Sequence, residues 1–427
     1  MGVENNIPEG WVNTTLGEIS KVQTGPFGTQ LKNEQYITGG TPVITVEHIK
    51  DFRISDFDYP SVTNEDRDRL SKYLLKEGDI VFTRVGSVDL SAYVSEKQDG
   101  WMFSSRMLNV RPTNQVDSKY ISYFFRQPLF RSYIFRISVG ATMPSINTGI
   151  LKSIPISYPP LPEQKAIAKV LTAFDDKIEL LQAQNKTLET MAQTIFKEWF
   201  GKYQVGDELP EGWRVGEFGE VIEFINGYAF KSKDLSKEPI DNAYKVFKMG
   251  DINKGGGFKP GKTKGYFPKS MSTKLNKYIL KNGDLLMSMT DMKDAISLLG
   301  HTALMIYEDE YIVNQRVGLI RVKNDINIEY PYLYLLTNND DFIARIRAGA
   351  NSGVQVNLST QGIKETEFII ADKETNKAFN NVVMPLFEKR KANSQMIKEL
   401  KKTRDTLLPK LMSGQVRVNN IKQTANA

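Results

Sequence analysis

The amino-acid sequence predicts an α+β protein in which two similar mixed α/β domains are joined by two long helices that form an antiparallel coiled coil. Three observations predict this fold: an internal repeat, a heptad pattern after each copy of the repeat, and one asparagine within each heptad pattern. We expect the domains at residues 1–160 and 204–372, and the helices at 161–203 and 373–427, the last range ending in a basic tail. A chain built in this order is pseudo-two-fold symmetric.

The internal repeat begins with the tetrapeptide "PEGW", which stands at residues 8–11 and again at an offset of 202. Two further stretches return in the same order, with the offset drifting only to 205 and then 210: "LKEGDIVFTR" (75–84) as "LKNGDLLMSM" (280–289), and "SSRMLNVRP" (104–112) as "NQRVGLIRV" (314–322). Ordered agreement over more than a hundred residues indicates a duplication. A chain of 427 residues, 40% of them apolar, is long enough for two cores of ordinary domain size.

A heptad pattern follows the first copy, from Pro162 to about Phe200. Apolar residues recur at alternating spacings of four and three, and Asn185 fills the one remaining position: Ile167, Leu171, Phe174, Ile178, Leu181, Leu188, Ala192, Ile195 and Trp199. This spacing is typical of the a and d positions of a coiled coil. A single stripe would favour a helix packed on its own domain, whereas two stripes of equal length favour mutual pairing.

The second copy is followed by the same pattern at a constant offset of 212: Phe379, Val383, Leu386, Arg390, Asn393, Ile397, Leu400, Arg404, Leu407 and Leu411. Pro385 lies inside this stretch, and an interior proline costs a helix about 3 kcal/mol. We therefore expect the second helix to kink at Pro385 or to begin near it.

The two asparagines distinguish the possible directions of pairing. In a parallel pair in register, each asparagine would face an aliphatic side chain, at a cost of about 1 to 3 kcal/mol per buried amide. In an antiparallel pair that aligns Ile167 with Leu411, Asn185 falls opposite Asn393, and the two amides can bind each other. The sequence therefore predicts antiparallel helices with this asparagine pair as the marker of register.

Composition limits the chemistry that is available to the chain. There is no cysteine, which excludes disulfides and cysteine-based zinc or iron sites, and no apolar run approaches the length that spans a bilayer. We expect a cytoplasmic protein. The net charge is +6, but residues 389–427 hold ten Lys or Arg against Glu399 and Asp405, so the basic charge is concentrated at this end. Such a tail fits DNA, an acidic partner or a solvated helix face equally well.

A nucleotide-binding signal is weak. Residues 256–263 match the P-loop pattern literally, but no hydrophobic strand precedes them. Gly265 and Pro268 also exclude the helix whose N-terminus would face the phosphates. We interpret the segment as a basic, glycine-rich surface loop.

Metal and catalytic signals are weak as well. His48 and His301 are too few for a multi-histidine metal site, and we expect both to form hydrogen bonds at the surface or in a groove. Asp284, Asp291 and Lys293 suggest a metal-dependent nuclease only faintly, because the repeat aligns Asp284 with Asp79 at a turn that enters a strand. We expect no catalytic residue, no metal site and no cofactor bound by this chain.

With these features in view, the chain resembles the specificity (S) subunit of type I restriction-modification systems. The resemblance covers essentially the whole chain, and the following motifs carry it: "PEGW" opening each half, "LGEI" (16–19), "GPFGTQLK" (25–32), "GATMPSINTGILKSIPISYPPLPEQKAIAKVL" (140–171), "IFKEWF" (195–200) and "LLPKLMSGQVRV" (407–418). The second copy departs from the pattern, because "IIADKETNKAFNNVV" (369–383) lacks the Pro-Glu-Gln turn of the first.

The resemblance implies a DNA-binding role without catalysis. Each globular domain is expected to be a target recognition domain that reads one half of a split site in double-stranded DNA, with the coiled coil setting the spacer. The two helices are expected to bind two modification (methyltransferase) subunits, and the restriction (translocase-nuclease) subunits join through the complex. S-adenosylmethionine, ATP and Mg²⁺ are then expected on the partner subunits.

Side chains that could contact DNA are polar residues able to make two-point hydrogen bonds and cations for phosphates, both placed on loops. The candidates in the first domain are Thr24, Gln30, Lys32, Arg84, Ser87, Ser105, Arg106, Thr142, Ser145 and Asn147. Those in the second are Asn226, Tyr228, Lys231, Lys254, Lys259, Lys262, Lys293, Gln315, Arg316, Asn351, Gln355 and Asn357. The pairs that the repeat matches, Arg106 with Arg316 and Asn147 with Asn357, could equally hold the fold.

Two other classes of function stay open from the sequence. One is a coiled-coil adaptor that does not read DNA, and the other is an ATP-using enzyme with its site at residues 256–263. DNA binding that weakens steeply with salt separates the first from a DNA reader, and nucleotide binding tests the second.

Overall fold

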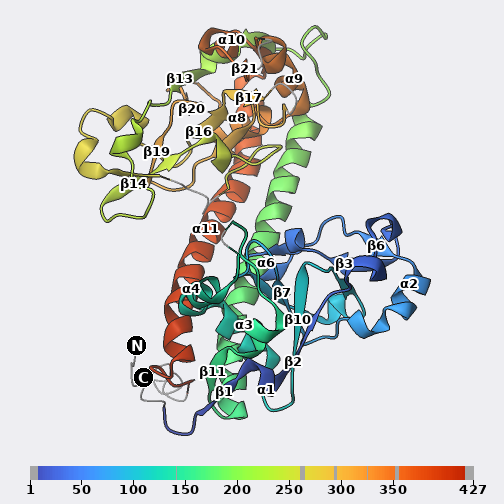
Figure 1. Ribbon diagram of the computed structural model, residues 1–427. Coiled ribbons are helices and arrows are strands. Elements are labelled where there is room, and N and C mark those ends of the chain that lie inside the picture. The colour runs from blue at the N-terminus through green and yellow to red at the C-terminus, as the bar shows by residue number, and fades with distance from the viewer. Residues whose placement is uncertain are drawn as a thin grey trace. The chain divides into compact units, whose positions relative to one another are not determined.

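The computed structural model describes residues 8–140, 142–259, 265–292, 296–324, 326–351 and 355–418, and the chain divides into two compact units (Figure 1). The first unit consists of Met1–Leu180 and Ile397–Ala427, and the second of Leu181–Met396. Each unit contains part of both long helices, α6 (Leu161–Phe200) and α11 (Lys373–Met412). Within the described ranges, no helix carries an apolar stretch of the length that crosses a membrane.

A four-stranded antiparallel sheet forms the centre of the first unit, in the order β2 (Ser20–Thr24), β10 (Met107–Pro112), β7 (Ile80–Thr83) and β8 (Ser91–Tyr93). Both faces of this sheet are covered. Ile80 and Phe82 pack on the helical side, where the rings of Phe82 and Phe125 lie 4.6 Å apart, and Val81 packs on the other side. This two-sided burial explains the continuous apolar run in β7. The helices on the first side are α3 (Ser118–Arg126) and α4 (Pro128–Ile137).

Residues 26–79, which we call the first distal segment, form much of the layer on the other face. The segment contains α2 (Asn64–Arg69) and strands of two small sheets, β3 (Thr41–Ile44) with β6 (Ser61–Val62), and β4 (Ile49–Lys50) with β5 (Arg53–Ile54). β9 (Met102–Phe103) pairs in parallel with β3. The remaining elements connect the unit to α6: β1 (Val12–Thr15), α1 (Leu16–Ile19), α5 (Thr148–Lys152) and β11 (Pro155–Tyr158), with β1 antiparallel to β11.

The second unit repeats this architecture. Its central sheet has the order β13 (Ile222–Asn226), β20 (Val317–Val322), β16 (Leu285–Ser288) and β18 (Thr302–Leu304). Residues 228–284, the second distal segment, contribute β14 (Ala243–Phe247) and β15 (Tyr266–Pro268), and β14 pairs in parallel with β19 (Tyr311–Val313). The other elements are β12 (Arg214–Glu217), α7 (Phe218–Val221), β17 (Thr290–Met292), α8 (Tyr330–Leu336), α9 (Asp340–Ala348), β21 (Gln355–Asn357), α10 (Thr360–Lys364) and β22 (Glu367–Ile370). The duplication predicted from the sequence is therefore present as two units of one topology.

One buried ion pair recurs at the same place in both sheets. Asp79 accepts hydrogen bonds from Nε and Nη2 of Arg111 at 2.7 and 2.6 Å, and Asp284 accepts from the same atoms of Arg321 at 2.8 and 2.9 Å. Both carboxylates also accept from the backbone of the turn before the strand. The two aspartates that the repeat aligned thus hold the turn to the sheet, and the structural interpretation of Asp284 is confirmed.

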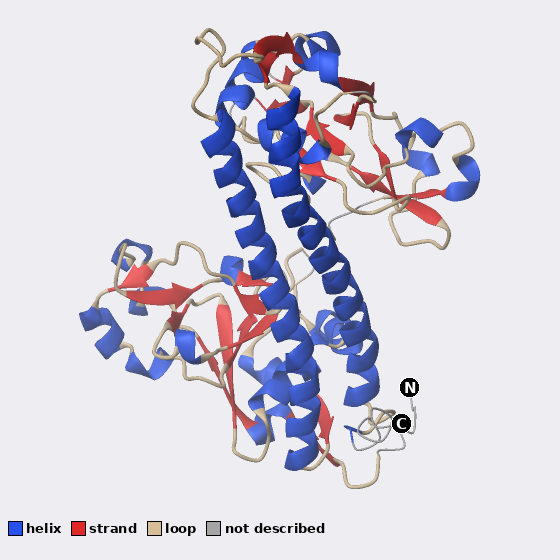
Figure 2. Ribbon diagram, turned by 180° about the vertical axis from the view of Figure 1, so that it is seen from behind, coloured by secondary structure: helices blue, strands red, loops and turns tan. Residues whose placement is uncertain are grey.

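The long helices lie side by side (Figure 2), and their contacts show that they run antiparallel in each unit, as the sequence predicted. In the first unit, Glu163 pairs with Arg417 and Asp175 with Arg404, so residue numbers rise along α6 as they fall along α11. In the second unit, Asn185 contacts Asn393, and the rings of Trp199 and Phe379 lie 5.7 Å apart. Every residue of both heptad patterns is buried or half-buried.

The asparagine contact expected from the sequence is present. Nδ2 of Asn393, a residue only 2% exposed, donates to Oδ1 of Asn185 at 3.0 Å. Asn185 in turn donates to the hydroxyl of Ser394 at 3.1 Å, a third member of the cluster that the heptad pattern did not indicate. The polar positions of the seam therefore bind one another.

Pro385 neither begins nor ends the second helix. α11 starts at Lys373 after Asp372, whose carboxylate accepts from the backbone N–H of Thr375 at 2.9 Å. Of the two expected effects of Pro385, a helix start near it is therefore wrong, and a kink at it stays a prediction. Val383 and Phe387 on either side are buried in the core, and this packing offsets the missing hydrogen bond.

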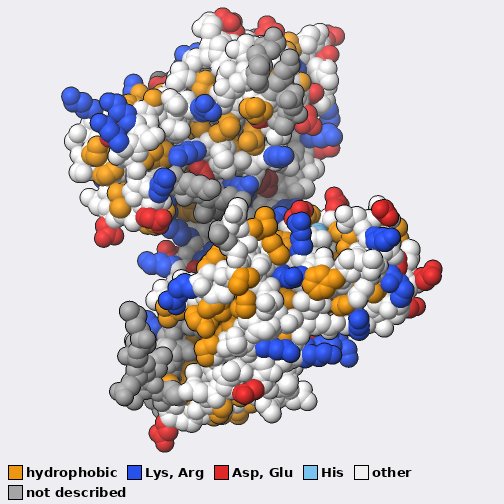
Figure 3. Space-filling model, in the orientation of Figure 1, with side chains coloured by type: hydrophobic (Ala, Val, Ile, Leu, Met, Phe, Trp, Pro, Cys, Tyr) orange, Lys and Arg blue, Asp and Glu red, His pale blue; other side chains and the backbone are white. Residues whose placement is uncertain are grey.

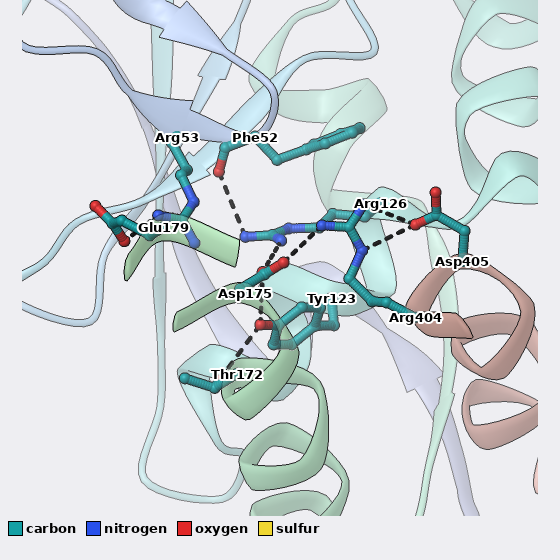
Figure 4. A network of polar contacts seen from close by, with 9 residues as sticks. All are labelled: Phe52, Arg53, Tyr123, Arg126, Thr172, Asp175, Glu179, Arg404 and Asp405. Carbon is teal, nitrogen blue, oxygen red and sulfur yellow. Dashed lines mark hydrogen bonds and ion pairs between the residues drawn. The ribbon is translucent and has the colours of Figure 1, made fainter. Parts of the chain in front are cut away.

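A second polar cluster joins three helices of the first unit around Asp175, which is 4% exposed (Figure 4). Its carboxylate accepts from Arg126 of α3 and from Arg404 of α11, both at 2.6 Å, and from the hydroxyl of Tyr123 at 2.8 Å. Arg126 also donates to the backbone carbonyl of Phe52 at 3.4 Å. One α6 carboxylate thus connects α3, α11 and, through Arg126, the distal segment.

We expect Asn185→Leu to destabilise the second unit by about 1 to 3 kcal/mol, because Asn393 would lose its buried acceptor. The double variant with Asn393→Leu should cost less than the sum of the two single variants, with a coupling of about 0.5 to 3 kcal/mol. Denaturant unfolding of the four proteins measures this coupling. Strictly additive effects would contradict it, and Gln182→Leu on the exposed face of α6 serves as the control.

Asp175 should give the first unit an acid-sensitive contribution to stability. Burial alone raises the pKa of its carboxyl, but Arg126 and Arg404 outweigh burial and hold the pKa below its ordinary value. A carboxylate with a lowered folded pKa stabilises the protein above its unfolded pKa, about 3.9, and this contribution is lost as the pH falls below it.

We therefore expect Asp175→Asn to lower the free energy of unfolding at pH 7 by about 3 to 5 kcal/mol, since the half-buried guanidinium groups of Arg126 and Arg404 lose the buried carboxylate between them. The difference from the wild type should shrink as the pH falls below about 4. Urea unfolding at several pH values measures it, with the exposed neighbour Asp176→Asn as the charge-matched control. A difference that does not change with pH would contradict the assignment.

Candidate nucleic-acid interface

Four chain segments of the first unit converge at one edge of its central sheet. β2 and β7 both end at this edge, and β10, which lies between them, begins there. Backbone hydrogen bonds join Gly25 to Met107, Arg84 to Arg106 and Ile146 to Arg84, with lengths of 2.8 to 3.2 Å. We call residues 24–30, 84–87, 104–106 and 142–146 the first loop cluster. It contains eight predicted candidates: Thr24, Gln30, Arg84, Ser87, Ser105, Arg106, Thr142 and Ser145.

A close backbone approach explains why glycine follows β2. A Cβ atom on Gly25 would lie 2.1 Å from the carbonyl oxygen of Ser104. The corresponding Gly227 in the second unit would place a Cβ 2.1 Å from the carbonyl oxygen of Asn314. Only glycine allows these loops to meet, so the shared glycine of the repeat builds the loop cluster rather than contacting a ligand.

Arg84 is held in place by an aromatic ring. Its guanidinium carbon lies 4.6 Å from the centre of the Phe27 ring, and Nη1 donates to the carbonyl of Ser105 at 3.3 Å. Phe27 itself is 44% exposed and was not among the predicted residues. An aromatic side chain between two glycines of a loop was the available sequence signal. A guanidinium stacked on a ring keeps further N–H donors in a fixed plane, which suits two-point recognition.

The second unit forms an equivalent second loop cluster from residues 226–228, 289–292, 314–316 and 355–357. Met289 donates its N–H to the carbonyl of Arg316 at 3.2 Å and accepts from the N–H of Leu358 at 2.9 Å. β17 and β21 then pair so that Met292 lies opposite Gln355. The cluster brings together six predicted candidates: Asn226, Tyr228, Gln315, Arg316, Gln355 and Asn357, and Asn351 joins it by accepting from the N–H of Asn357 at 2.9 Å.

The two clusters share one cation and differ at another position. Arg106 and Arg316 occupy the same place and are both exposed. Arg84, by contrast, has Met289 as its counterpart, because each makes the same backbone bond to its arginine. Met289 is only 9% exposed. The backbone arrangement is thus common to both units, whereas the side chains that it presents are not.

The predicted match of Asn147 with Asn357 is wrong. Asn147 caps α5 by accepting from the N–H of Ile150 at 2.9 Å, and Ser359 caps α10 in the same way, accepting from Gly362 at 2.9 Å. Asn147 therefore corresponds to Ser359, and Asn357 corresponds to Ser145, which lies in the matching bridge with Val85. Two residues inserted in the second copy before this point shifted the alignment. Asn147 holds the fold.

The remaining described candidates, Lys32, Lys231, Lys254 and Lys259, lie on the distal segments. Lys32, Lys231 and Lys254 are exposed and Lys259 is half-buried. Gln30 accepts a hydrogen bond from the hydroxyl of Tyr73 at 2.6 Å, so its carbonyl oxygen is engaged within the fold. Lys262 and Lys293 lie outside the described residues.

Both histidines are buried, which corrects the expectation that they lie at the surface or in a groove. His48 is 2% exposed, accepts from the N–H of Thr45 at 2.9 Å and stacks on Tyr59. His301 is 8% exposed and contacts Asn338. Desolvation lowers the pKa of both imidazoles, so each is a neutral hydrogen-bonding group of the core.

The described part of the chain holds no cluster of three or more acidic or histidine side chains that could bind a metal ion. The literal P-loop match falls partly outside the described residues, at 260–263. The chain after it forms the strand β15 rather than a helix, so the helix N-terminus that would face phosphates is missing from residues 265–268. The chemistry that the described loops support is hydrogen bonding and charge pairing.

Comparison with known proteins places these features in context. A family model described as the type I restriction modification DNA specificity domain matches residues 8–190 and, a second time, residues 210–402. The type I restriction enzyme MjaIX specificity subunit of Methanocaldococcus jannaschii is 25% identical over 442 residues, which covers 97% of this chain and 95% of that protein. The EcoKI specificity subunit of Escherichia coli is 21% identical, with coverage of 98% and 88%.

A solved structure supports the fold. The crystal structure of a type I restriction-modification system S subunit from M. genitalium aligns with a TM-score of 0.57 at 16% identity, covering 96% of this chain and 98% of that one. At this identity the match bears on the fold alone, and it agrees with two repeated units of mixed helix and sheet.

Proposed function

The chain belongs to the family of type I restriction modification DNA specificity domains, and from this premise we propose that each of its two units reads one half of a bipartite DNA target. The observation that carries the proposal is the pair of loop clusters, which share a backbone arrangement but present different side chains. Two loop clusters with the same backbone arrangement but different side chains suit a DNA target whose two halves differ in sequence. Binding selection with the assembled complex tests this, and DNA binding without sequence preference would leave only the adaptor role.

We further propose a division of roles within each loop cluster. Side chains common to both units, such as Arg106 and Arg316, suit the phosphate backbone, because phosphates are the same in any sequence. Side chains that differ, such as Arg84 against Met289, suit the base edges. Asn357 and Ser145 form a second differing pair, at matching places in the two clusters.

The partners follow from the repeat. We propose that one chain binds two copies of the modification subunit, since two similar units present similar surfaces twice. The exposed basic side chains of α11 within residues 389–404 are the candidate docking surface. Restriction subunits would join through the complex, and S-adenosylmethionine, ATP and Mg²⁺ would bind to partner subunits.

Native mass spectrometry at saturating modification subunit should therefore give a complex with two copies of it per chain. The reason is the duplicated surface, which offers two equivalent sites. A stable 1:1 complex under these conditions would contradict the stoichiometry.

Arg84 is the residue for which we expect an effect on sequence preference alone. Arginine most often binds guanine in the major groove, and loss of such a contact costs about 1 to 3 kcal/mol of discrimination at one base pair. We expect Arg84→Ala to relax one guanine position of one half-site and to leave the other half-site unchanged. Binding selection with the assembled complex measures both half-sites.

Arg106→Ala is the matched control, because Arg106 is present in both units and should weaken binding to all sequences alike. Phe27→Ala should reproduce the effect of Arg84→Ala, whereas Phe27→Tyr should retain the wild-type preference, since the ring still carries the guanidinium. An unchanged preference in Arg84→Ala would remove Arg84 from the reading residues.

The coiled coil is proposed to set the gap between the half-sites. α6 has 40 residues, and a helix of this length extends about 60 Å at ~1.5 Å per residue. One heptad inserted into both helices keeps the seam in phase and adds about 10 Å, equivalent to about three base pairs. The variant should prefer the same half-sequences with a longer gap. Three added base pairs also rotate one half-site about the DNA axis by roughly a hundred degrees relative to the other. Mapping of methylated sites reveals the gap, and an unchanged gap in an active variant would contradict the role of the coil.

A further inference from the structure

The two distal segments occupy matching places in the repeat but carry opposite charge. Residues 26–79 contain seven Lys or Arg and ten Asp or Glu, a net charge of −3. Residues 228–284 contain thirteen lysines against five Asp or Glu, a net charge of +8. On the face that Figure 3 shows, blue side chains gather over the part of the second unit that carries β14. The distal segment is therefore acidic in the first unit and basic in the second.

The three arginines of the first distal segment are paired within the fold, whereas its four lysines have no ion pair with a described residue. Arg69 pairs with Asp66, Arg67 with Asp68, and Arg53 with Glu179 of α6. Asp66 also accepts from the side chain of Gln35 at 2.8 Å. The guanidinium groups of this segment are therefore already partly neutralised by carboxylates beside them.

Lys245 of the second distal segment pairs with Glu310, but many of its other described lysines are exposed. Lys274 stands at the position of Arg69, since each lies four residues before the tyrosine that ends a 3-10 turn. Each tyrosine ring also has a lysine over it, Lys72 at 4.9 Å from Tyr73 and Lys277 at 5.0 Å from Tyr278. The exposed lysines of this segment have no ion pair with any described residue: Lys231, Lys233, Lys237, Lys254, Lys274, Lys277 and Lys281.

Some of these lysines lie beside the second loop cluster. The backbone of Tyr228 bridges Asn314, two residues before Arg316, and the Tyr228 ring contacts Phe230 at 5.0 Å and Tyr278 at 5.4 Å. This aromatic group places Lys231 and Lys277 at the margin of the loops that we propose to read bases. A row of open cations next to base-reading loops matches the regular negative charge of a DNA backbone.

We propose that the two units divide the work of DNA binding unequally, and this inference rests on the proposed function. The second distal segment holds the phosphate backbone and supplies most of the salt-dependent affinity. The first unit reads its half-site with few phosphate contacts, because its acidic distal segment repels the same backbone. The partner of the basic surface is double-stranded DNA rather than an acidic protein, since Lys231 and Lys277 adjoin the reading loops.

The test compares two triple variants that remove the same charge. Lys231→Gln, Lys277→Gln and Lys281→Gln change the second distal segment, and Lys32→Gln, Lys72→Gln and Lys76→Gln change the first. All six lysines are exposed, and two of the three pairs, Lys72 with Lys277 and Lys76 with Lys281, are at matched positions of the repeat. Binding of the complete complex with modification subunits to a duplex carrying its target is measured as salt rises from about 50 to 200 mM.

Each phosphate contact contributes about 0.9 to the slope of log K against log salt, so the second-segment triple should lower the slope by about 2 to 3. The first-segment triple should lower it by less than about 1. Both variants should keep the wild-type sequence preference, and thermal unfolding checks that both fold. Equal changes of slope, a larger change in the first-segment triple, or no change in either would overturn the inference. A wild-type complex without sequence preference would instead overturn the proposed function.

Discussion

The packing of α6 against α11 is the interaction on which the rest of the structure depends. Each unit completes its core with apolar side chains from both helices, such as Ile167 with Leu411 in the first unit and Ala192 with Phe379 in the second. A helix with such a stripe buries little on its own, and most of its stability comes from the surface that it packs against. The sheets, the loop clusters and the distal segments are all built outward from these two helices.

Polar contacts give this packing its direction and its choice of partner. The asparagines pair only in the antiparallel register. In three ion pairs α6 supplies the acid, and α11 or the residues after it supply the arginine: Glu163 with Arg417, Asp175 with Arg404, and Glu189 with Arg390. Two copies of α6 in the same register would place Ala192 opposite Asp175 and Ile178 opposite Glu189, so both acids would lose their arginines. The charge pattern thus favours the pairing of unlike helices, as it does in coiled coils generally.

The sequence predicted the features that follow from periodicity and repetition. The duplication, the two helices, their direction and the contact of Asn185 with Asn393 could all be derived, because spacing alone determines which residues share a face. Features that depend on tertiary neighbours could not be derived. The burial of His48 and His301 depends on segments distant in sequence that pack over them. Pro385 is tolerated because residues on both sides of it are packed in the core. The stacking of Arg84 on Phe27 joins two loops that are far apart in the sequence. The mismatch of Asn147 arose from a small insertion that only the capped helices reveal.

The first unit is built from two separate stretches of the chain, and this has a consequence for folding during protein synthesis. The second unit is one continuous stretch, 181–396, and can close as soon as that stretch has left the ribosome. The first unit begins earlier in the chain but needs Leu408, Leu411 and Met412 for its core. At roughly 5 to 20 residues per second, its N-terminal part waits on the order of ten seconds or more for these residues, so the usual order of domain folding is reversed. A nascent chain interrupted before residue 397 is left with an open first core, which exposes it to chaperones and proteases.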